Sequence, residues 1–116
     1  MVNVNSVILA GCIARPPTLS YRPDGVAVLR FVLVVEEENP KLDKTFKTAV
    51  PCELVGDRAA ALGDPAQALG SELAEGDTVV VRGRLAYRAT AESAGGTLGV
   101  LCQRVECLEH TAHVPF

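Results

Sequence analysis

Arginine recurs on one side of a strand that is predicted over residues 79–88. Arg82, Arg84 and Arg88 are separated by even numbers of residues, so their side chains share one face of a continuous strand. The opposite, inward face is apolar and consists of Val81, Leu85 and Tyr87. A row of guanidinium groups suits a ligand that carries phosphates, because each group offers parallel N–H donors to phosphate oxygens. The alternative is a solvated charged face with Tyr87 in the core.

Gly83 adds a second possibility for this strand. A glycine there can introduce a β-bulge, which changes the side on which Tyr87 lies. On the surface, the Tyr87 ring would be a platform for stacking a planar ligand. The chain contains two Tyr, three Phe and no Trp, so few other side chains can supply such stacking.

The cysteines and histidines do not follow a metal-binding motif. The four cysteines are Cys12, Cys52, Cys102 and Cys107. None of them forms a Cys-x-x-Cys pair, and the last two are an odd number of residues apart, so a continuous strand points them to opposite faces. Zinc needs several converging ligands, whereas His110 and His113 both lie near the C-terminus. We therefore expect buried thiols, no metal and no cofactor, with a metal site or a disulfide as the alternatives.

Arrangements for catalysis are equally weak. A Ser-His-Asp triad would have to use the histidines near the C-terminus, and no phosphate-cradling Gly-x-x-x-x-Gly-Lys motif occurs. The acidic residues that could hold magnesium are predicted in loops and in a helix. The sequence therefore predicts a protein that is not an enzyme.

Length and composition indicate one globular domain. The 116 residues fit a single domain, and a hydrophobic share of 48% can form a core. No apolar run approaches the ~18 residues that cross a bilayer, and the N-terminus lacks the basic start of an export signal. We expect a cytoplasmic protein with a domain over residues 1–110 and a short tail over residues 111–116.

Charge is distributed unevenly along the chain. Residues 1–35 carry three Arg against one Asp, residues 36–78 carry four basic against ten acidic residues, and residues 79–116 carry four Arg against three Glu. These balances of +2, −6 and +1 give the formal net charge of −3. A polyanion would be repelled by the middle third and held by the flanking thirds.

Alternating apolar residues and turn residues predict five strands and one helical segment. The first strand starts at Val7 and ends before Arg15-Pro16-Pro17, where two prolines remove backbone donors. The later elements are an extended segment over residues 18–22, a strand over 26–35, a polar tip over 36–44, a strand over 46–55, a helix over about 65–74, and strands over 79–88 and 97–108 joined by a flexible tip over 91–96.

Particular residues support these boundaries. Pro23-Asp24-Gly25 is a turn between two extended segments, and Asp64-Pro65 is a helix start because Pro is tolerated at the first helical position. An apolar stripe at helical spacing comprises Leu62, Ala66, Leu69 and Leu73. In the third strand, the inward residues are Val50, Cys52 and Leu54.

The order of these elements favours one fold. Five strands with one helix between the third and the fourth is the order of an OB-fold, a five-stranded Greek-key barrel in the all-β class. The number of elements alone leaves other small β-barrels open.

Several segments, in the same order, resemble the bacterial single-stranded DNA-binding protein family. They are residues 5–11 (NSVILAG), Ala14-Arg15-Pro16, residues 19–28 (LSYRPDGVAV), residues 31–35, residues 50–56 and residues 68–85, which include EGDTVVVRGRL. The resemblance covers about residues 3–110. It implies an OB-fold that binds single-stranded DNA in replication, recombination or repair, without catalysis.

The resemblance also implies which side chains contact DNA. The candidates for nucleic-acid binding are Arg82, Arg84, Arg88, Tyr87, Arg15, Arg22, Tyr21, Arg30, Lys41, Lys44 and Lys47. Residues 36–38 are all Glu, expected in a solvated turn, and Glu53 is a further charge that opposes phosphate. Pro51 removes a ladder donor, so we expect an edge or an irregular strand there.

The chain differs from the family where the family stacks bases. Ala49, Val55 and Thr90 stand at positions where the family has aromatic rings. Stacking contributes ~1–3 kcal/mol per base, so their absence implies weaker binding unless other contacts compensate. Extra residues also lie around 63–65, and the family's long linker and acidic stretch are missing.

The last three residues, Val114, Pro115 and Phe116, resemble the terminus through which that family recruits replication and repair enzymes. A terminal Phe ring fills an apolar pocket while the α-carboxylate meets a basic residue. We expect these residues to bind protein partners, with a chance Pro-Phe ending as the alternative. They would lie close to the barrel.

Two functional hypotheses follow. The first is single-stranded DNA binding, with a homodimer or homotetramer formed through the exposed edge near residues 3–9. The second is a protein-interaction module of the replication machinery, similar to primosomal replication protein N, with weak or lost DNA binding.

Overall fold

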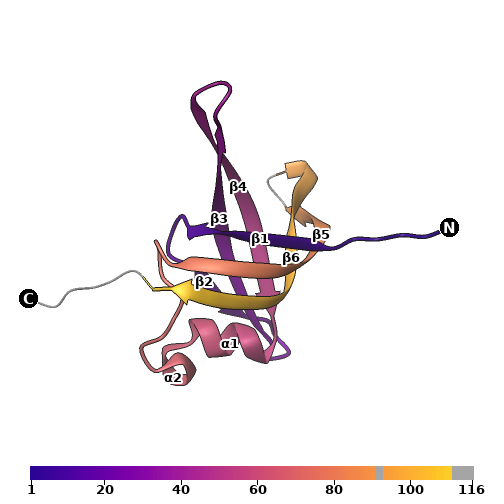
Figure 1. The fold of residues 1–116 in the computed structure, drawn as a ribbon. Coiled ribbons are helices and arrows are strands. Elements are labelled where there is room, and N and C mark those ends of the chain that lie inside the picture. The colour runs from indigo at the N-terminus through magenta and orange to yellow at the C-terminus, as the bar shows by residue number, and fades with distance from the viewer. Residues whose placement is uncertain (91–92, 111–116) are drawn as a thin grey trace, which may run out of the picture.

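The structure is a computed structural model that describes residues 1–90 and 93–110, without the side chains of residues 88–90 and 93–96. Its elements, shown in Figure 1, are β1 (Val7–Ile13), β2 (Thr18–Tyr21), β3 (Ala27–Asn39), β4 (Lys44–Val55), α1 (Asp57–Gly63), α2 (Pro65–Ala68), β5 (Thr78–Thr90) and β6 (Ser93–Glu109). Neither of the helices in this part of the chain is long and apolar enough to span a membrane.

Five of the strands close into a barrel. β1 pairs with β5, β5 with β6, β6 with β4, β4 with β3, and β3 returns to β1. Only the β4–β6 pairing in this ring is parallel. β2 pairs with β3 outside the ring. The helices lie between β4 and β5, the third and fourth strands of the barrel, which confirms the predicted OB-fold.

The barrel interior is filled by alternate residues of its strands. The most deeply buried large side chains are Ile13, Leu29, Leu33, Leu54, Val79, Val81 and Val100. Cys52 and Leu54 are buried and Val50 is half-buried against the same core, as predicted for β4. The core is therefore aliphatic, and Phe31 is the aromatic ring that the described residues contribute to it.

The first hairpin forms where the turn residues predict it. Gly25 has a φ of 86°, and its N–H donates to the carbonyl oxygen of Arg22 at 2.8 Å. Asp24 Oδ1 accepts a hydrogen bond from the N–H of Val26 at 3.0 Å. Glycine takes positive φ without a steric penalty, and the Asp carboxylate satisfies the next free donor.

The second hairpin is longer than predicted. Residues 36–38 belong to β3 and are exposed, so the expectation of a solvated turn there is wrong. The turn itself is confined to residues 40–43, with Asp43 at a φ of 50°. Backbone pairing continues to Asn39 and Lys44, which makes a two-stranded ribbon that rises above the barrel in Figure 1. Hydrogen bonds between β3 and β4 extend both strands through residues 36–39, although this polar sequence by itself favours a loop.

The last hairpin is also longer than predicted. β6 begins at Ser93, so the glycines at 95 and 96 lie within the strand and not in a tip over residues 91–96. The connection at residues 91–92 lies outside the described part of the chain.

The helix predicted to start at Pro65 does so, but a helix that was not predicted, α1, precedes it. α1 is the longer helix, and it packs Ala59 and Ala60 into the core. α2 begins at Pro65, where the side chain of Asp64 accepts the N–H of Ala66 at 2.9 Å. This confirms the Asp-Pro start, since the Asp oxygen satisfies a donor that the first turn leaves unpaired.

The predicted helix over residues 65–74 is wrong in length, because α2 is a single turn. Leu69 adopts a left-handed conformation with a φ of 53°, and Gly70 follows with a φ of 91°. Leu69 is exposed, whereas Leu73 is buried and donates its N–H to the carbonyl oxygen of Leu62. Of the predicted apolar stripe, Leu62 and Leu73 therefore reach the core, from the end of α1 and from an extended segment, whereas Ala66 and Leu69 are exposed.

A β-bulge in β6 changes which residues face inward. Arg82 pairs with Arg104 and Gly83 with Cys102, so Gln103 is an extra residue. A Cβ at Gly83 would lie 2.1 Å from the carbonyl oxygen of Leu101, so this close crossing requires glycine. Arg58 Nη1 of α1 donates to the carbonyl oxygen of Gln103 at 2.7 Å, which satisfies the bulge.

The bulge corrects the expectation for the cysteines of this strand. Cys102 is buried and Cys107 is half-buried against the same core, so they do not point to opposite faces. The parity argument fails because one extra residue between them shifts the alternation.

A pair of leucine substitutions on the same hairpin tests this core. Leu33, fully buried in β3, should lose about 2–5 kcal/mol of unfolding free energy in Leu33→Ala, because a cavity remains in the aliphatic core. Leu42, exposed in the turn, should change it by less than about 0.5 kcal/mol in Leu42→Ala. Urea unfolding of both variants measures the difference, and equal losses would contradict this arrangement.

Candidate nucleic-acid interface

The barrel opens at Pro51. The β4–β6 pairing consists of residues 52–54 against residues 100–102 and does not extend to Pro51. The carbonyl oxygen of Val32, the β3 partner of Pro51, accepts the N–H of Ala14, so it points away from β4. In an antiparallel pair of strands, two residues that face each other direct their backbone groups either both inward or both outward. The Pro51 nitrogen therefore also points away from β3, toward β6, and it has no N–H to offer there. β4 remains regular against β3 here, so of the two expectations the edge strand is confirmed and the irregular strand is not.

Beyond this point the sheet divides into two parts, the β3–β4 ribbon and the β5–β6 hairpin, visible as separate projections in Figure 1. An open groove of about 1130 Å³ lies between them. Its lining residues come from the segment after β1 and from five strands, β2 to β6: Arg15, Pro16, Thr18, Arg30, Phe31, Val32, Pro51, Cys52, Glu53, Arg84, Leu85, Ala86, Tyr87, Thr97, Gly99, Val100 and Leu101.

The ribbon presents a regular outer face to this groove. Cross-strand partners on that face are Arg30 with Glu53, Val32 with Pro51, Val34 with Ala49, and Glu36 with Lys47. Arg30 Nε lies 3.4 Å from Glu53 Oε2, and Lys47 Nζ lies 3.5 Å from Glu36 Oε1. The face therefore carries two ion pairs separated by apolar or small side chains. Ala49 and Val55, which stand in place of rings, are on this same face.

The predicted arginine stripe is divided between two surroundings. Arg82 and Arg84 are both exposed on β5, but only Arg84 lines the groove. Arg88 belongs to β5, and its side chain lies outside the described residues, as does that of Thr90. Among the residues that the structure describes, neither Arg15 nor Arg84 forms an ion pair, so both can receive an anion.

Tyr87 is on the surface. Its side chain is 74% exposed and lines the groove, so the alternative that places it in the core is wrong. Leu85 is also exposed, although Val81 on the same side of β5 is buried. The alternation continues along β5, but the pairing of β5 with β1 ends at Gly83. Among the described residues, the side of β5 that is buried at Val81 is therefore exposed at Leu85 and Tyr87.

The residues of the first hairpin are also divided. Arg15 and Arg30 line the groove, whereas Tyr21 and Arg22 do not. The Tyr21 hydroxyl donates to Asp64, which raises the Tyr21 pKa and lowers the pKa of the Asp64 carboxyl. Arg22 Nη2 lies 3.3 Å from Asp24 Oδ2. Tyr21 thus attaches the hairpin to the residue that precedes α2, whereas Arg22 pairs within the hairpin turn.

The three lysines lie on the ribbon, outside the groove lining. All are exposed. Lys47 is on the outer face that continues from the groove, Lys44 is on the opposite face of β4, and Lys41 is in the turn. The ribbon thus extends the charged face only through Lys47, which Glu36 partly neutralises.

Sequence reasoning missed the apolar part of the groove. Val32, Pro51, Leu85 and Leu101 line it, and none was assigned to a site. Outward parity on β3 and β4 could have identified Val32 and Pro51. The exposure of Leu85 depends on where β5 leaves the barrel, which no local pattern indicates.

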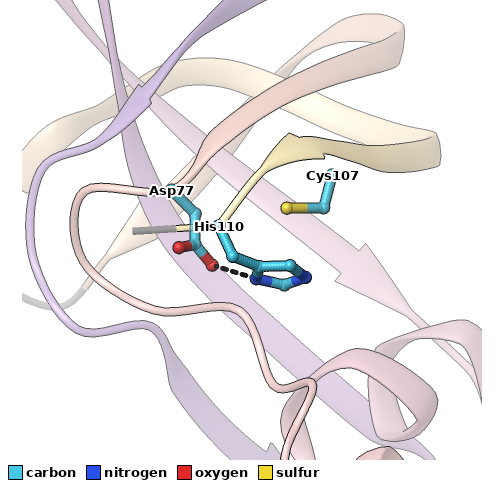
Figure 2. A group of neighbouring side chains, drawn as sticks. All are labelled: Asp77, Cys107 and His110. Carbon is cyan, nitrogen blue, oxygen red and sulfur yellow. Dashed lines mark hydrogen bonds and ion pairs between the residues drawn. The ribbon is translucent and has the colours of Figure 1, made fainter. Parts of the chain in front are cut away.

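The thiols lie in three different surroundings. Cys52 and Cys102 are buried, as expected, and a hydrogen bond that the Cys52 thiol donates to Cys102, together with burial, raises the pKa of Cys52. Cys12 is exposed. Cys107 lies beside Asp77 and His110, as Figure 2 shows, and burial followed by the Asp77 charge raises its pKa. The expectation of buried thiols therefore fails for Cys12.

Comparisons with known proteins agree with this geometry. The chain matches the Single-strand binding protein family over residues 4–108. It is 33% identical over 91 residues to a protein named single-stranded DNA-binding protein from Borreliella burgdorferi, covering 77% of this chain and 56% of that protein.

Two crystal structures of the single-stranded DNA binding protein from Thermus aquaticus, the wild type and a deletion mutant, have the same fold. Their TM-scores are 0.74 and 0.71, each at 24% identity and over 91% of this chain. This chain covers 50% and 51% of them, so it spans about half the length of the relatives it matches. The fold and the match over nearly the whole chain establish that it belongs to the single-strand binding protein family.

Proposed function

We propose that this chain binds single-stranded DNA in the groove between the β3–β4 ribbon and the β5–β6 hairpin. The observation that carries the proposal is the position of Arg15, Arg84 and the exposed Tyr87 ring around one open groove with an apolar floor. Cations along a groove hold phosphates, and an exposed ring accepts an unstacked base. The matched relative is named for the same ligand.

Each group has a physical role in this proposal. Arg15 and Arg84 bind phosphates, with Lys47 extending the path along the ribbon. Tyr87 stacks on a base, while Val32 and Pro51 contact sugars and base edges. Binding without catalysis serves replication, recombination or repair in the cytoplasm, as expected from the sequence. The protein-interaction module is not favoured, since the matched family is the DNA-binding one.

Fluorescence anisotropy with labelled oligothymidine at two salt concentrations tests this function. Neutralised phosphates release counterions, so affinity should fall steeply as salt rises. A duplex of the same length is the control and should bind more weakly, because its bases cannot reach Tyr87. Failure to bind oligothymidine at low salt would reject the proposal.

Two arginines on one strand separate the groove from the remaining surface. Arg84→Ala should weaken oligothymidine binding and reduce the salt slope by about 0.7, the value for one phosphate contact on a single strand. Arg82→Ala is the matched control, because Arg82 is exposed on the same strand but does not line the groove. Equal effects of the two substitutions would place the DNA path elsewhere.

Tyr87 can be tested through binding and stability together. Tyr87→Ala should cost ~1–3 kcal/mol of binding free energy, the range for one stacked base. Its unfolding free energy should change by less than about 0.5 kcal/mol, because the ring is exposed. Tyr87→Phe keeps the ring and should bind like the parent. A large loss of stability in the alanine variant would indicate a structural role.

Glu53 should limit affinity. Its carboxylate lies in the groove, 3.4 Å from the guanidinium of Arg30, where it repels phosphate and occupies a cation. In Glu53→Gln, affinity for oligothymidine should rise at low salt, and the salt slope should steepen by up to about 0.7 as Arg30 reaches a phosphate. Binding titrations at several salt concentrations measure both. Unchanged affinity would show that DNA avoids this part of the floor.

The chain should form a homodimer or homotetramer. β1 pairs with β5 along residues 7–12 but meets β3 only at Cys12 and Ile13, which leaves its other edge open within the described strands. Ile8 on β1 is 60% exposed. An open edge with exposed apolar side chains favours pairing with a second copy. Light scattering at micromolar concentration should give a multiple of the monomer mass, and a monomer mass would contradict this.

Val114, Pro115 and Phe116 remain a predicted partner-binding tail and lie outside the described residues. If they recruit replication or repair proteins, a chain lacking them should lose those proteins in a pull-down while retaining oligothymidine binding. Equal recovery with both chains would remove the tail from the proposal.

A further inference from the structure

A second group of chemically active side chains lies at the opposite end of β5 from the groove. Asp77 directly precedes β5, while Cys107 and His110 come from the end of β6. One ligand atom from each residue lies within 4.8 Å of the others. Figure 2 shows the three side chains converging on one small region. None of these three residues lines the groove.

We propose that Asp77, Cys107 and His110 form a binding site for one Zn²⁺ ion. A thiolate, an imidazole and a carboxylate are the three ligand types that zinc takes in proteins, and a water would complete a tetrahedron. Mg²⁺ and Ca²⁺ select oxygen ligands, so a site with sulfur and nitrogen discriminates against both.

The spacing of two of these ligands already suits a tetrahedral ion. Asp77 Oδ2 and His110 Nδ1 are 3.1 Å apart. Two ligands at ~2.0–2.1 Å from a tetrahedral zinc are about 3.3 Å apart, so only a small opening is needed. His110 is exposed and Cys107 is half-buried, which gives the ion a path of entry.

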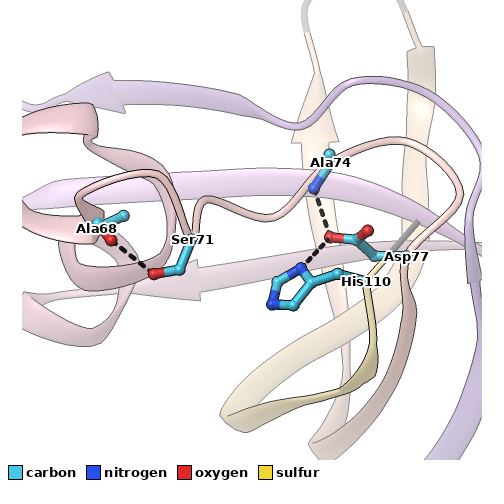
Figure 3. A network of polar contacts seen from close by, with 5 residues as sticks. All are labelled: Ala68, Ser71, Ala74, Asp77 and His110. Atoms are coloured by element: carbon cyan, nitrogen blue, oxygen red, sulfur yellow. Dashed lines mark hydrogen bonds and ion pairs between the residues drawn. The ribbon is translucent and has the colours of Figure 1, made fainter. Parts of the chain in front are cut away.

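The backbone around Asp77 fixes the position of its carboxylate. Asp77 is 1% exposed, its N–H donates to the carbonyl oxygen of Ala74, and its Oδ2 accepts the N–H of Ala74 at 2.9 Å. Figure 3 shows this turn with His110 against it. The main-chain carbonyl oxygen of Asp77 accepts the N–H of Ile13 at the end of β1. Such outer hydrogen bonds orient ligating carboxylates.

The irregularities of β6 bring the other two ligands to the same place. The extra residue Gln103 turns Cys107 toward the core side, and a second register shift lies between the pairs Thr78–Glu109 and Val79–Cys107. Cys107 and His110 then both reach Asp77 from the strand end. A bound ion would fasten the end of β6 to the turn that precedes β5.

Cobalt titration of the reduced, untagged full chain, after removal of metal with EDTA, tests the site. Co²⁺ should bind with one ion per chain and give thiolate-to-cobalt charge-transfer absorption, which one equivalent of Zn²⁺ should abolish. Losing a single outer partner weakens metal sites ~10–100-fold, so losing a ligand in His110→Ala should weaken binding by more than about ten-fold. Cys107→Ser should remove the charge-transfer absorption.

Cys12→Ser is the matched control, since Cys12 is an exposed thiol that contacts the Thr78 hydroxyl and is not one of the three ligands. It should retain both the absorption and the affinity of the parent. The test uses no Asp77 variant, because the buried Asp77 carboxylate also holds the preceding turn through the N–H of Ala74. Absence of the charge-transfer absorption, its persistence in Cys107→Ser, its loss in Cys12→Ser, or unchanged affinity in His110→Ala would each overturn the zinc site.

Discussion

The architecture depends on the shortness of the contact between β4 and β6. Residues 52–54 pair in parallel with residues 100–102, and this contact joins the two antiparallel parts of the sheet into a closed barrel. On one side it encloses the aliphatic core. On the other, Pro51 has no N–H to offer β6, and a side chain at Gly99 would lie 2.7 Å from the Pro51 carbonyl oxygen. Closure and the groove are thus set by the same few residues.

The electrostatics of the groove follow from the register of the β3–β4 ribbon. That register places Arg30 opposite Glu53 and Glu36 opposite Lys47, so each cation on the outer face has an anion beside it. Exposed ion pairs are weak, which allows a phosphate to compete for the cation. The net charge of −3 then acts against a polyanion at long range, while Arg15 and Arg84 attract it locally.

Local chemistry made part of this structure predictable. The turn at Asp24 and Gly25 and the helix start at Asp64 depend on hydrogen bonds between near neighbours, and each was expected from two or three residues. The end of α2 was not, because Leu69 takes a conformation that favours glycine. Arg84 and Tyr87 were identified as candidates. Their separation from Arg82 was not predictable, because it depends on pairings between distant strands.

The extra residue Gln103 shifts the alternation of inward and outward side chains along β6. Before it Cys102 faces inward, and after it Val105 and Cys107 do, while Arg104 and Glu106 remain outside as an ion pair. Arg58 binds the main-chain carbonyl oxygen of residue 103, which any amino acid provides. Position 103 should therefore accept many substitutions. Deleting residue 103 would bring Arg104 next to Cys102 in regular alternation, so the same side chains would face inward and the carbonyl oxygen that Arg58 binds would be lost. At this point the chain can vary in identity and in length, whereas deleting Val105 would put the charged Glu106 at an inward position.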